Sequence, residues 1–239
     1  MSPDELTRIR QTYAARMDAA AHDTRYSNFN ESYLFAWQQR QRDVLTLLRT
    51  LNCTQLYSKR VLEIGCGAGG VLLEYLSYGV AGDKLFGVDL MPSLLRRAAH
   101  RLPHIALACA DGQSLPYAAQ TFDLVLQYTM FSSILDAQVK ANIAREMLRV
   151  LKPDGMIIWY DFWLNPANRA TRGIPLREVR ALFPSCRLLW RRVTLAPPIT
   201  RRLVRISWML CALLEKLRLF NSHLLVAIRL LIAHGRTMR

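Results

Sequence analysis

The sequence predicts an α/β protein with a mainly parallel sheet that helices cover on both faces. After residue 55, short apolar runs of strand length alternate with amphipathic stretches of helix length, which is typical of such sheets. A glycine cluster joins the first apolar run to the first amphipathic stretch. The chain has 239 residues, of which 51% are hydrophobic, so it can bury a sizeable core and is too apolar for a disordered protein.

The alternation places strands at residues 60–65, 84–89, 105–109, 122–127 and 156–161. Helices are expected at 71–78, from Pro92 and from near Asp136, and proline is well tolerated where a helix begins. The helix from Asp136 carries apolar residues at spacings of three and four, namely Val139, Ile143, Met147, Val150 and Leu151. Pro153-Asp154-Gly155 is expected to stop it.

Both ends of the chain depart from this alternation. Residues 1–55 have no strand pattern and predict a helical cap, with one helix before Ala21 and another at 31–51. We expect the main domain at 56–239. Its last part is predicted to contain a loop at 165–173, a helix at 176–183, a strand at 187–195, a helical segment at 200–220 and a strand at 223–229. The connection between the last two strands is too long for handedness rules to fix their relative direction.

Basic residues gather in the last third of the chain. Residues 1–164 carry 17 basic and 16 acidic side chains, whereas residues 165–239 carry 15 basic side chains and two acidic ones. We therefore expect 165–220 to be a basic region on the acceptor side. This excess favours an anionic partner, such as a phosphorylated substrate, an acidic membrane surface or a nucleic acid. The alternative is a solvated basic face that serves solubility.

Cysteine usage and hydrophobic runs narrow the class of protein. The five cysteines are widely spaced with no C-x-x-C pair, which argues against a disulfide framework and against a zinc site. The N-terminal stretch is charged and lacks an apolar signal core, and the nine-residue run Ile206–Leu214 is too short to span a bilayer. We expect a cytoplasmic protein, either free or peripheral to the inner face of the membrane.

The stretch Val61-Leu-Glu-Ile-Gly-Cys-Gly-Ala-Gly-Gly70 reads as a strand, a tight turn and a helix start. Glycines let the backbone turn sharply and let a ligand approach, and the helix N-terminus favours an anionic group. Asp89 ends the next strand, where an acid can hold both hydroxyls of a ribose. The glycines alone also fit a dinucleotide pattern, so Glu63, just before the turn, and Asp111, after the third strand, favour a different adenosine cofactor.

Four motifs between about residues 55 and 165 resemble class I S-adenosylmethionine-dependent methyltransferases of the small-molecule type 11 branch. They are VLEIGCGAGG, FGVDLMPSLLRRA, ADGQSLPYAAQTFDLVL and EMLRVLKPDGMIIWYDF. The resemblance implies S-adenosylmethionine as cofactor and a Rossmann-like sheet of order 3-2-1-4-5-7-6 with strand 7 antiparallel. It also implies that 223–229 lies beside strand 5. Two alternatives remain: a nicotinamide or flavin oxidoreductase, and a non-catalytic cofactor-binding protein.

The resemblance also implies which residues hold the cofactor. The turn would cradle the methionyl part, Asp89 would take the ribose diol, and the residues after the third strand would read the adenine. A lid before the core, in 25–26, would close on the cofactor carboxylate. The implied set is Arg25, Tyr26, Glu63, Gly65, Cys66, Gly67, Asp89, Leu90, Asp111, Gly112 and Gln127.

Methyl transfer from a sulfonium is an in-line displacement, and alignment alone can contribute ~7–11 kcal/mol, so a base is optional. Asp161, at the end of the fifth strand, is the candidate base or substrate anchor, followed by Tyr128 and Tyr160. The alternative for Asp161 is a loop cap.

Gln127-Tyr128-Thr129-Met130 differs from the Asn/Asp-Pro-Pro-aromatic motif of nucleic-acid base methyltransferases. Because Gln127 replaces an acid of the catechol type, we expect no metal. We expect the acceptor to be an O or N atom of a small molecule, glycan or lipid-linked compound.

The segment from Thr200 to Phe220 has basic ends and an apolar middle that contains Trp208. One interpretation is an interfacial helix that docks on anionic lipid and reaches a lipid-linked substrate. Another is a helix that packs on the sheet and roofs the acceptor pocket. Binding of RNA, with RNA as the methyl acceptor, is the least favoured and predicts a steep salt dependence.

Overall fold

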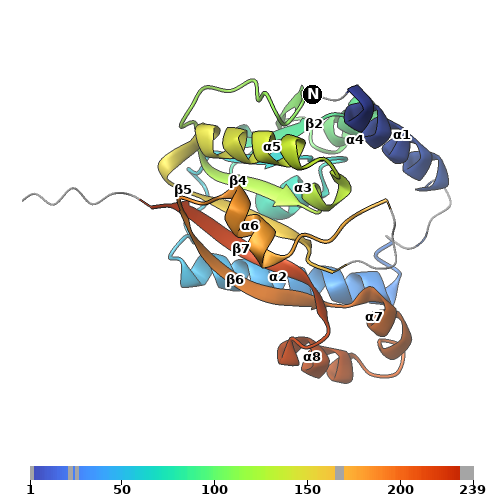
Figure 1. Ribbon diagram of the computed structural model, residues 1–239. Helices are drawn as coiled ribbons and strands as arrows, with labels where there is room; N and C mark the ends of the chain where they lie inside the picture. The colour runs from blue at the N-terminus through green and yellow to red at the C-terminus, as the bar shows by residue number, and fades with distance from the viewer. Residues whose placement is uncertain (1–2, 21–23, 25–26, 165–169, 232–239) are drawn as a thin grey trace, which may run out of the picture.

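A single mixed sheet forms the centre of the molecule in the computed structural model, which describes residues 3–20, 24, 27–164 and 170–231 (Figure 1). The strand order is β3-β2-β1-β4-β5-β7-β6. β7 runs antiparallel to β5 and β6, and the other neighbouring strands are parallel. The predicted fold class is confirmed. The strands are β1 Val61–Ile64, β2 Leu85–Asp89, β3 Ala106–Cys109, β4 Phe122–Tyr128, β5 Leu151–Phe162, β6 Cys186–Leu195 and β7 Asn221–Leu230.

Helices begin where the sequence supplies caps. The Asn30 side chain accepts from the first amides of α2, the Asp136 side chain does the same for α5, and Pro92 opens α4. The helices are α1 Pro3–Ala20, α2 Glu31–Thr50, α3 Gly70–Ser77, α4 Pro92–Arg101, α5 Ala137–Val150, α6 Leu176–Leu182, α7 Pro197–Leu203 and α8 Trp208–Leu217. Short 3-10 turns lie at Gly82–Lys84 and Phe131–Ser133.

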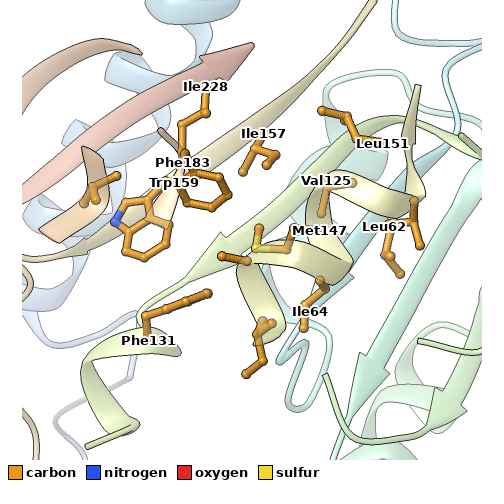
Figure 2. Packing of buried hydrophobic residues seen from close by; sticks show 14 of the residues in the cluster. Leu62, Ile64, Val125, Phe131, Met147, Leu151, Ile157, Trp159, Phe183 and Ile228 are labelled. Carbon is orange, nitrogen blue, oxygen red and sulfur yellow. The ribbon is translucent and has the colours of Figure 1, made fainter. Parts of the chain in front are cut away.

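Apolar side chains bury both faces of the sheet. In one cluster, α5 and α6 pack on strand residues that include Leu62 and Ile64; in the other, α2, α3 and α4 pack on the opposite face, which includes Val61. Successive strand residues point to opposite faces, so β1 is buried along its whole length. Trp159 is fully buried in the first cluster, beside Phe131 and Phe183 (Figure 2).

The predicted stop between α5 and the fifth strand was wrong in one respect. α5 ends at Val150, but β5 begins at once at Leu151, so Pro153-Asp154-Gly155 lies inside the strand. Leu151 pairs with Phe122, and the register shifts before Leu124 pairs with Met156. The turn-forming residues therefore make an irregularity in the strand, where a proline is tolerated.

The helical segment predicted at 200–220 is two helices rather than one. α7 ends at Leu203, and α8 begins after Ser207, whose hydroxyl accepts from the amide of Leu210 at 3.1 Å. A capping serine favours a new helix start over continuation of the old helix. The break changes the direction of the chain, and Figure 1 shows α8 beyond the edge of the layered core.

Candidate active site

A cavity of about 260 Å³ lies at the carboxyl ends of β1, β2 and β4, the edge where ligands bind in parallel α/β sheets. Its polar wall comes from the glycine turn and from the residues that follow β2 and β3. Its apolar wall comes from α1, α4 and α5. The lining residues are Leu6, Ile9, Tyr13, Ile64, Gly65, Gly67, Val88, Asp89, Leu90, Met91, Leu94, Ala110, Asp111, Gly112, Tyr128, Thr129, Met130, Ser133, Ile134, Val139 and Ile143.

The turn between β1 and α3 places glycines in left-handed backbone on its cavity side. Gly65 has a φ of 74° and Gly67 a φ of 52°, in the left-handed region where a side chain is strained. The amides of Gly65 and Cys66 both donate to the carbonyl of Val88, at 2.8 and 3.1 Å. These bonds hold the turn against β2. A Cβ on Gly67 would meet no atom within 4 Å, so the turn is open beside the cavity.

The two carboxylates predicted to face one cleft do line the same cavity. Asp89 accepts from the amides of Gly67 and Met91, each at 2.8 Å, and so joins the glycine turn to the end of β2. Burial raises the pKa of Asp89, although these two amides act in the opposite direction. Asp111 accepts from the backbone and side-chain nitrogens of Gln113, at 2.9 and 3.0 Å.

The other predicted residues divide into three groups. Gly65, Gly67, Leu90, Gly112 and Tyr128 also line the cavity. Arg25 and Tyr26 fall outside the described residues. The remaining ones are buried in the interior next to the cavity and do not line it, namely Glu63, Cys66, Gln127 and Asp161.

The side chains of Glu63 and Cys66 are buried beside the glycine turn and do not line the cavity. Glu63 is 2% exposed, and one of its carboxylate oxygens has no hydrogen-bond partner. Burial raises the pKa of Glu63 well above its usual range. The Cys66 sulfur packs so closely on β2 that a Cβ at Gly87 would lie 2.8 Å from it. Burial also raises the pKa of this thiol, so Cys66 behaves as a small buried filler.

The candidate catalytic side chains occupy different depths. Tyr128 lines the cavity, and its hydroxyl lies 3.2 Å from that of Tyr75. Burial raises its pKa well above the ordinary value. Tyr160 is buried and does not line the cavity, and its hydroxyl lies 2.8 Å from that of Thr194.

Asp161 is fully buried behind the cavity wall. It accepts from the amides of Ser132 at 3.1 Å and Phe162 at 2.8 Å, and burial raises its pKa to about 6. Its bond to Ser132 holds the loop after β4, whose Thr129, Met130 and Ser133 line the cavity.

The sequence predicts a helical cap or lid over 1–55, but not which residues of α1 line the cavity. Leu6, Ile9 and Tyr13 lie at spacings of three and four, a helical stripe that could have shown which face of α1 turns inward. Glu5 anchors the helix by accepting from the amide of Leu135 at 2.7 Å, and Arg8 donates to the carbonyl of Ser133 at 2.7 Å. The Arg8 guanidinium lowers the pKa of Glu5 to about 2.

These residues fit an adenosine-type cofactor with an amino-acid end. The turn has no Cβ at its open position, two carboxylates face the cavity, and apolar side chains form the opposite wall. Glu63, buried before the turn, has one carboxylate oxygen without a hydrogen-bond partner. In the described part of the chain, no group of three or more histidine, cysteine or acidic side chains is placed to hold a metal ion.

Comparisons with known proteins agree with this geometry. A family model described as a methyltransferase domain matches residues 61–155. Phthiotriol/phenolphthiotriol dimycocerosates methyltransferase 1 of Mycobacterium ulcerans is 31% identical over 55% of this chain and 49% of its own length. Malonyl-[acyl-carrier protein] O-methyltransferase of Halorhodospira halophila is 32% identical over 51% of this chain and 41% of its own length. The chain therefore matches about half of these relatives or less.

A solved structure shows the same fold over nearly the whole chain. Phosphoethanolamine N-methyltransferase 1 of Haemonchus contortus, in complex with phosphoethanolamine and S-adenosylhomocysteine, superposes with a TM-score of 0.65 at 15% identity. The superposition covers 98% of this chain and 52% of that one. The family match, the relatives and the fold agree with the resemblance in the motifs: residues 61–155 match a methyltransferase domain, and nearly the whole chain has the fold of this solved structure.

Proposed function

We propose that the protein transfers a methyl group from S-adenosylmethionine to an O or N atom of a small-molecule, glycan or lipid-linked acceptor. The observation that carries this proposal is the single cavity into which the glycine turn, Asp89 and Asp111 all face. The matched relatives are named for a dimycocerosate, an acyl-carrier-protein ester and phosphoethanolamine, which supports an acceptor of this class.

The chain's own residues would bind and orient the reactants. When bound, the cofactor supplies a methyl group on a sulfonium, already attached to a good leaving group. Asp89 would hold the ribose hydroxyls and Asp111 the adenine edge, while α1 and α5 exclude water from the other side. Alignment of this kind can lower the barrier by ~7–11 kcal/mol without a base.

Tyr128 is the proposed residue in contact with the reacting groups, because it lines the cavity after β4. Its raised pKa suits a hydrogen-bond donor rather than a base. Asp161 would act through the loop that it holds by the amide of Ser132, which supports a positioning role. If so, Asp161→Asn would change KM more than kcat. Loss of an inflection near pH 6 in kcat would instead favour Asp161 as the base.

The proposed acceptor would include compounds held at a membrane, with the protein in peripheral contact. No helix among the described residues is long and apolar enough to cross a bilayer. The basic C-terminal third would then face an anionic surface.

Incubation with S-adenosylmethionine and a panel of lipid, glycan and small-molecule acceptors tests the activity. We expect one acceptor class to gain the mass of a methyl group while S-adenosylhomocysteine is released, and Asp89→Ala to slow both. Binding of a nicotinamide cofactor in place of S-adenosylmethionine would contradict the proposal and favour an oxidoreductase.

A further inference from the structure

The α7–α8 segment, residues 197–220, packs on the rest of the protein through one face only. Val204 and Cys211 are buried there against Phe35 of α2 and Leu195 of β6. Trp208 lies edge-on to Phe35, with ring centroids 5.5 Å apart. The segment is thus firmly attached to the domain, and its opposite face is free of contacts that would bury it.

That opposite face is strongly apolar. Of the eighteen large apolar side chains that are exposed in the described residues, eight belong to this segment. Single exposed apolar residues are ordinary, whereas a cluster of this size marks an interaction surface. The eight are Ile206, Trp208, Met209, Leu210, Leu213, Leu217, Leu219 and Phe220, with Ile206 77% and Met209 82% exposed.

The exposed charges of the segment all have one sign. Every basic side chain of the segment is exposed, namely Arg201, Arg202, Arg205, Lys216 and Arg218. Its single acid, Glu215, is buried and accepts from the side-chain nitrogen of Asn221 at 3.3 Å. The exposed part of the segment therefore combines apolar side chains with positive charge, the composition of elements that lie in the interface of an anionic bilayer. A second copy would present the same positive charge and be repelled.

The segment leaves the sheet at the same end as the cavity, where the parallel strands have their carboxyl ends. It begins after Leu195 and ends before Asn221, and these two residues pair across β6 and β7. Two residues further along β7, His223 pairs with Phe162 at the carboxyl end of β5. A surface in contact with this segment would therefore lie at the same end of the sheet as the cofactor cavity.

We propose that the α7–α8 segment docks on anionic phospholipid, with the outer side chains of α8 in the headgroup layer and the arginines of α7 on the phosphates. This rests on the proposed function in so far as docking brings the cavity to a membrane-held acceptor. The docking itself is a property of the surface and is measured without methyl transfer.

Flotation of the full chain with vesicles tests the proposal. One set contains phosphatidylcholine and phosphatidylglycerol in equal parts, and the other phosphatidylcholine alone. We expect the protein to float with the anionic vesicles at low salt, at least tenfold more strongly than with neutral ones, and to lose part of this binding at high salt. Ile206→Ser with Met209→Ser should weaken binding to anionic vesicles at least tenfold, and so should Arg201→Gln with Arg202→Gln.

Two control variants change equivalent side chains elsewhere. Tyr57→Ser removes an aromatic side chain that is 77% exposed, and Arg96→Gln with Arg97→Gln removes an exposed arginine pair on α4. Both should float like the unchanged protein. Equal flotation of the Ile206 and Met209 double variant would overturn the proposal. A protein that does not bind either set of vesicles would also overturn it. In that case, a dimer in sedimentation would indicate a second copy as the partner of this face, and RNA binding would indicate a nucleic acid.

Calorimetry with S-adenosylmethionine on every variant separates this proposal from the proposed function. A variant that no longer floats with vesicles but binds S-adenosylmethionine with unchanged affinity has lost only the docking surface. Failure of all acceptors with intact flotation would instead contradict the proposed acceptor class.

Discussion

The cofactor half of the sheet and the α7–α8 segment use apolar residues in opposite ways. From β1 to β5, apolar side chains alternate between two buried faces, and the polar residues gather at one edge. In α7–α8, one face is buried and the other leaves apolar and basic side chains exposed together. The charges of the chain follow the same division, with a net charge of +1 up to residue 164 and +13 after it. This contrast underlies the two proposals, a ligand enclosed at the first region and a surface bound by the second.

The largest effect is expected in the glycine turn of the first region. Gly65→Val places a branched side chain at a φ of 74°, with its Cβ 2.9 Å from the Met130 side chain in the cavity wall. The strain and the overpacking together should cost about 2–5 kcal/mol, shared between unfolding and cofactor binding. Denaturant unfolding and calorimetry measure the two parts.

Gly70→Ala is the matched control in the same glycine cluster. Gly70 opens α3 with an ordinary φ, and a Cβ there meets no atom within 4 Å. This variant should bind the cofactor normally. Equal losses in both variants would show that the left-handed backbone and the Met130 contact at Gly65 are not the cause.

In the second region, the buried face should be sensitive. Val204 is 3% exposed and packs with Phe35 and Cys211. Val204→Ala should lower the free energy of unfolding by about 1–3 kcal/mol, because it leaves a cavity. Cofactor affinity should stay the same, since no residue of this cluster lines the cavity. An unchanged unfolding curve would show that the segment is not packed on the domain.

The position of α1 over the cavity should depend on the charge of Glu5. Glu5→Gln weakens bonds to Arg8 and to the amide of Leu135, so cofactor affinity should fall by about 1–2 kcal/mol. Because the folded-state pKa of Glu5 is lowered from 4.5 to about 2, its contribution is complete above pH 4.5 and is lost as the pH falls through 2.

Hydrogen exchange of the α1 amides against pH reads this anchoring directly. Glu31→Gln, at the exposed start of α2, is the control. Identical α1 exchange in Glu5→Gln and the unchanged protein would contradict the anchoring role.

The smallest effect on stability is expected on the outer face of α8. Met209 is 82% exposed, so Met209→Ser should change the free energy of unfolding by no more than about 0.5 kcal/mol. A loss of several kcal/mol would mean that this face is buried in the folded protein, against another copy or another part of the chain.

Local sequence signals predicted the fold of the first region, because its strands and its glycine turn depend on local backbone geometry. A strand, a glycine turn and an acid at the next strand end follow from short stretches of sequence, and they meet because parallel strands end at one edge. The helical cap was expected at 1–55, but only tertiary contact shows that Leu6 and Ile9 of α1 line the cavity.

In the second region, the sequence indicated an amphipathic segment but not its break. The pattern predicts one helical segment through Ser207, whereas Ser207 caps α8. Which face of the segment is buried depends on Phe35, far away in the sequence, so no local pattern could settle it.

The most direct test of the central claim, that the edge after β2 holds an adenosine cofactor, is calorimetry of S-adenosylmethionine binding to Asp89→Ala. We expect the unchanged protein to bind and Asp89→Ala to bind at least tenfold more weakly, about 1.4 kcal/mol. Asp83→Ala, at an exposed carboxylate before the same strand, should bind as the unchanged protein does. Equal affinity in all three proteins, with unfolding curves that confirm intact folds, would contradict the account.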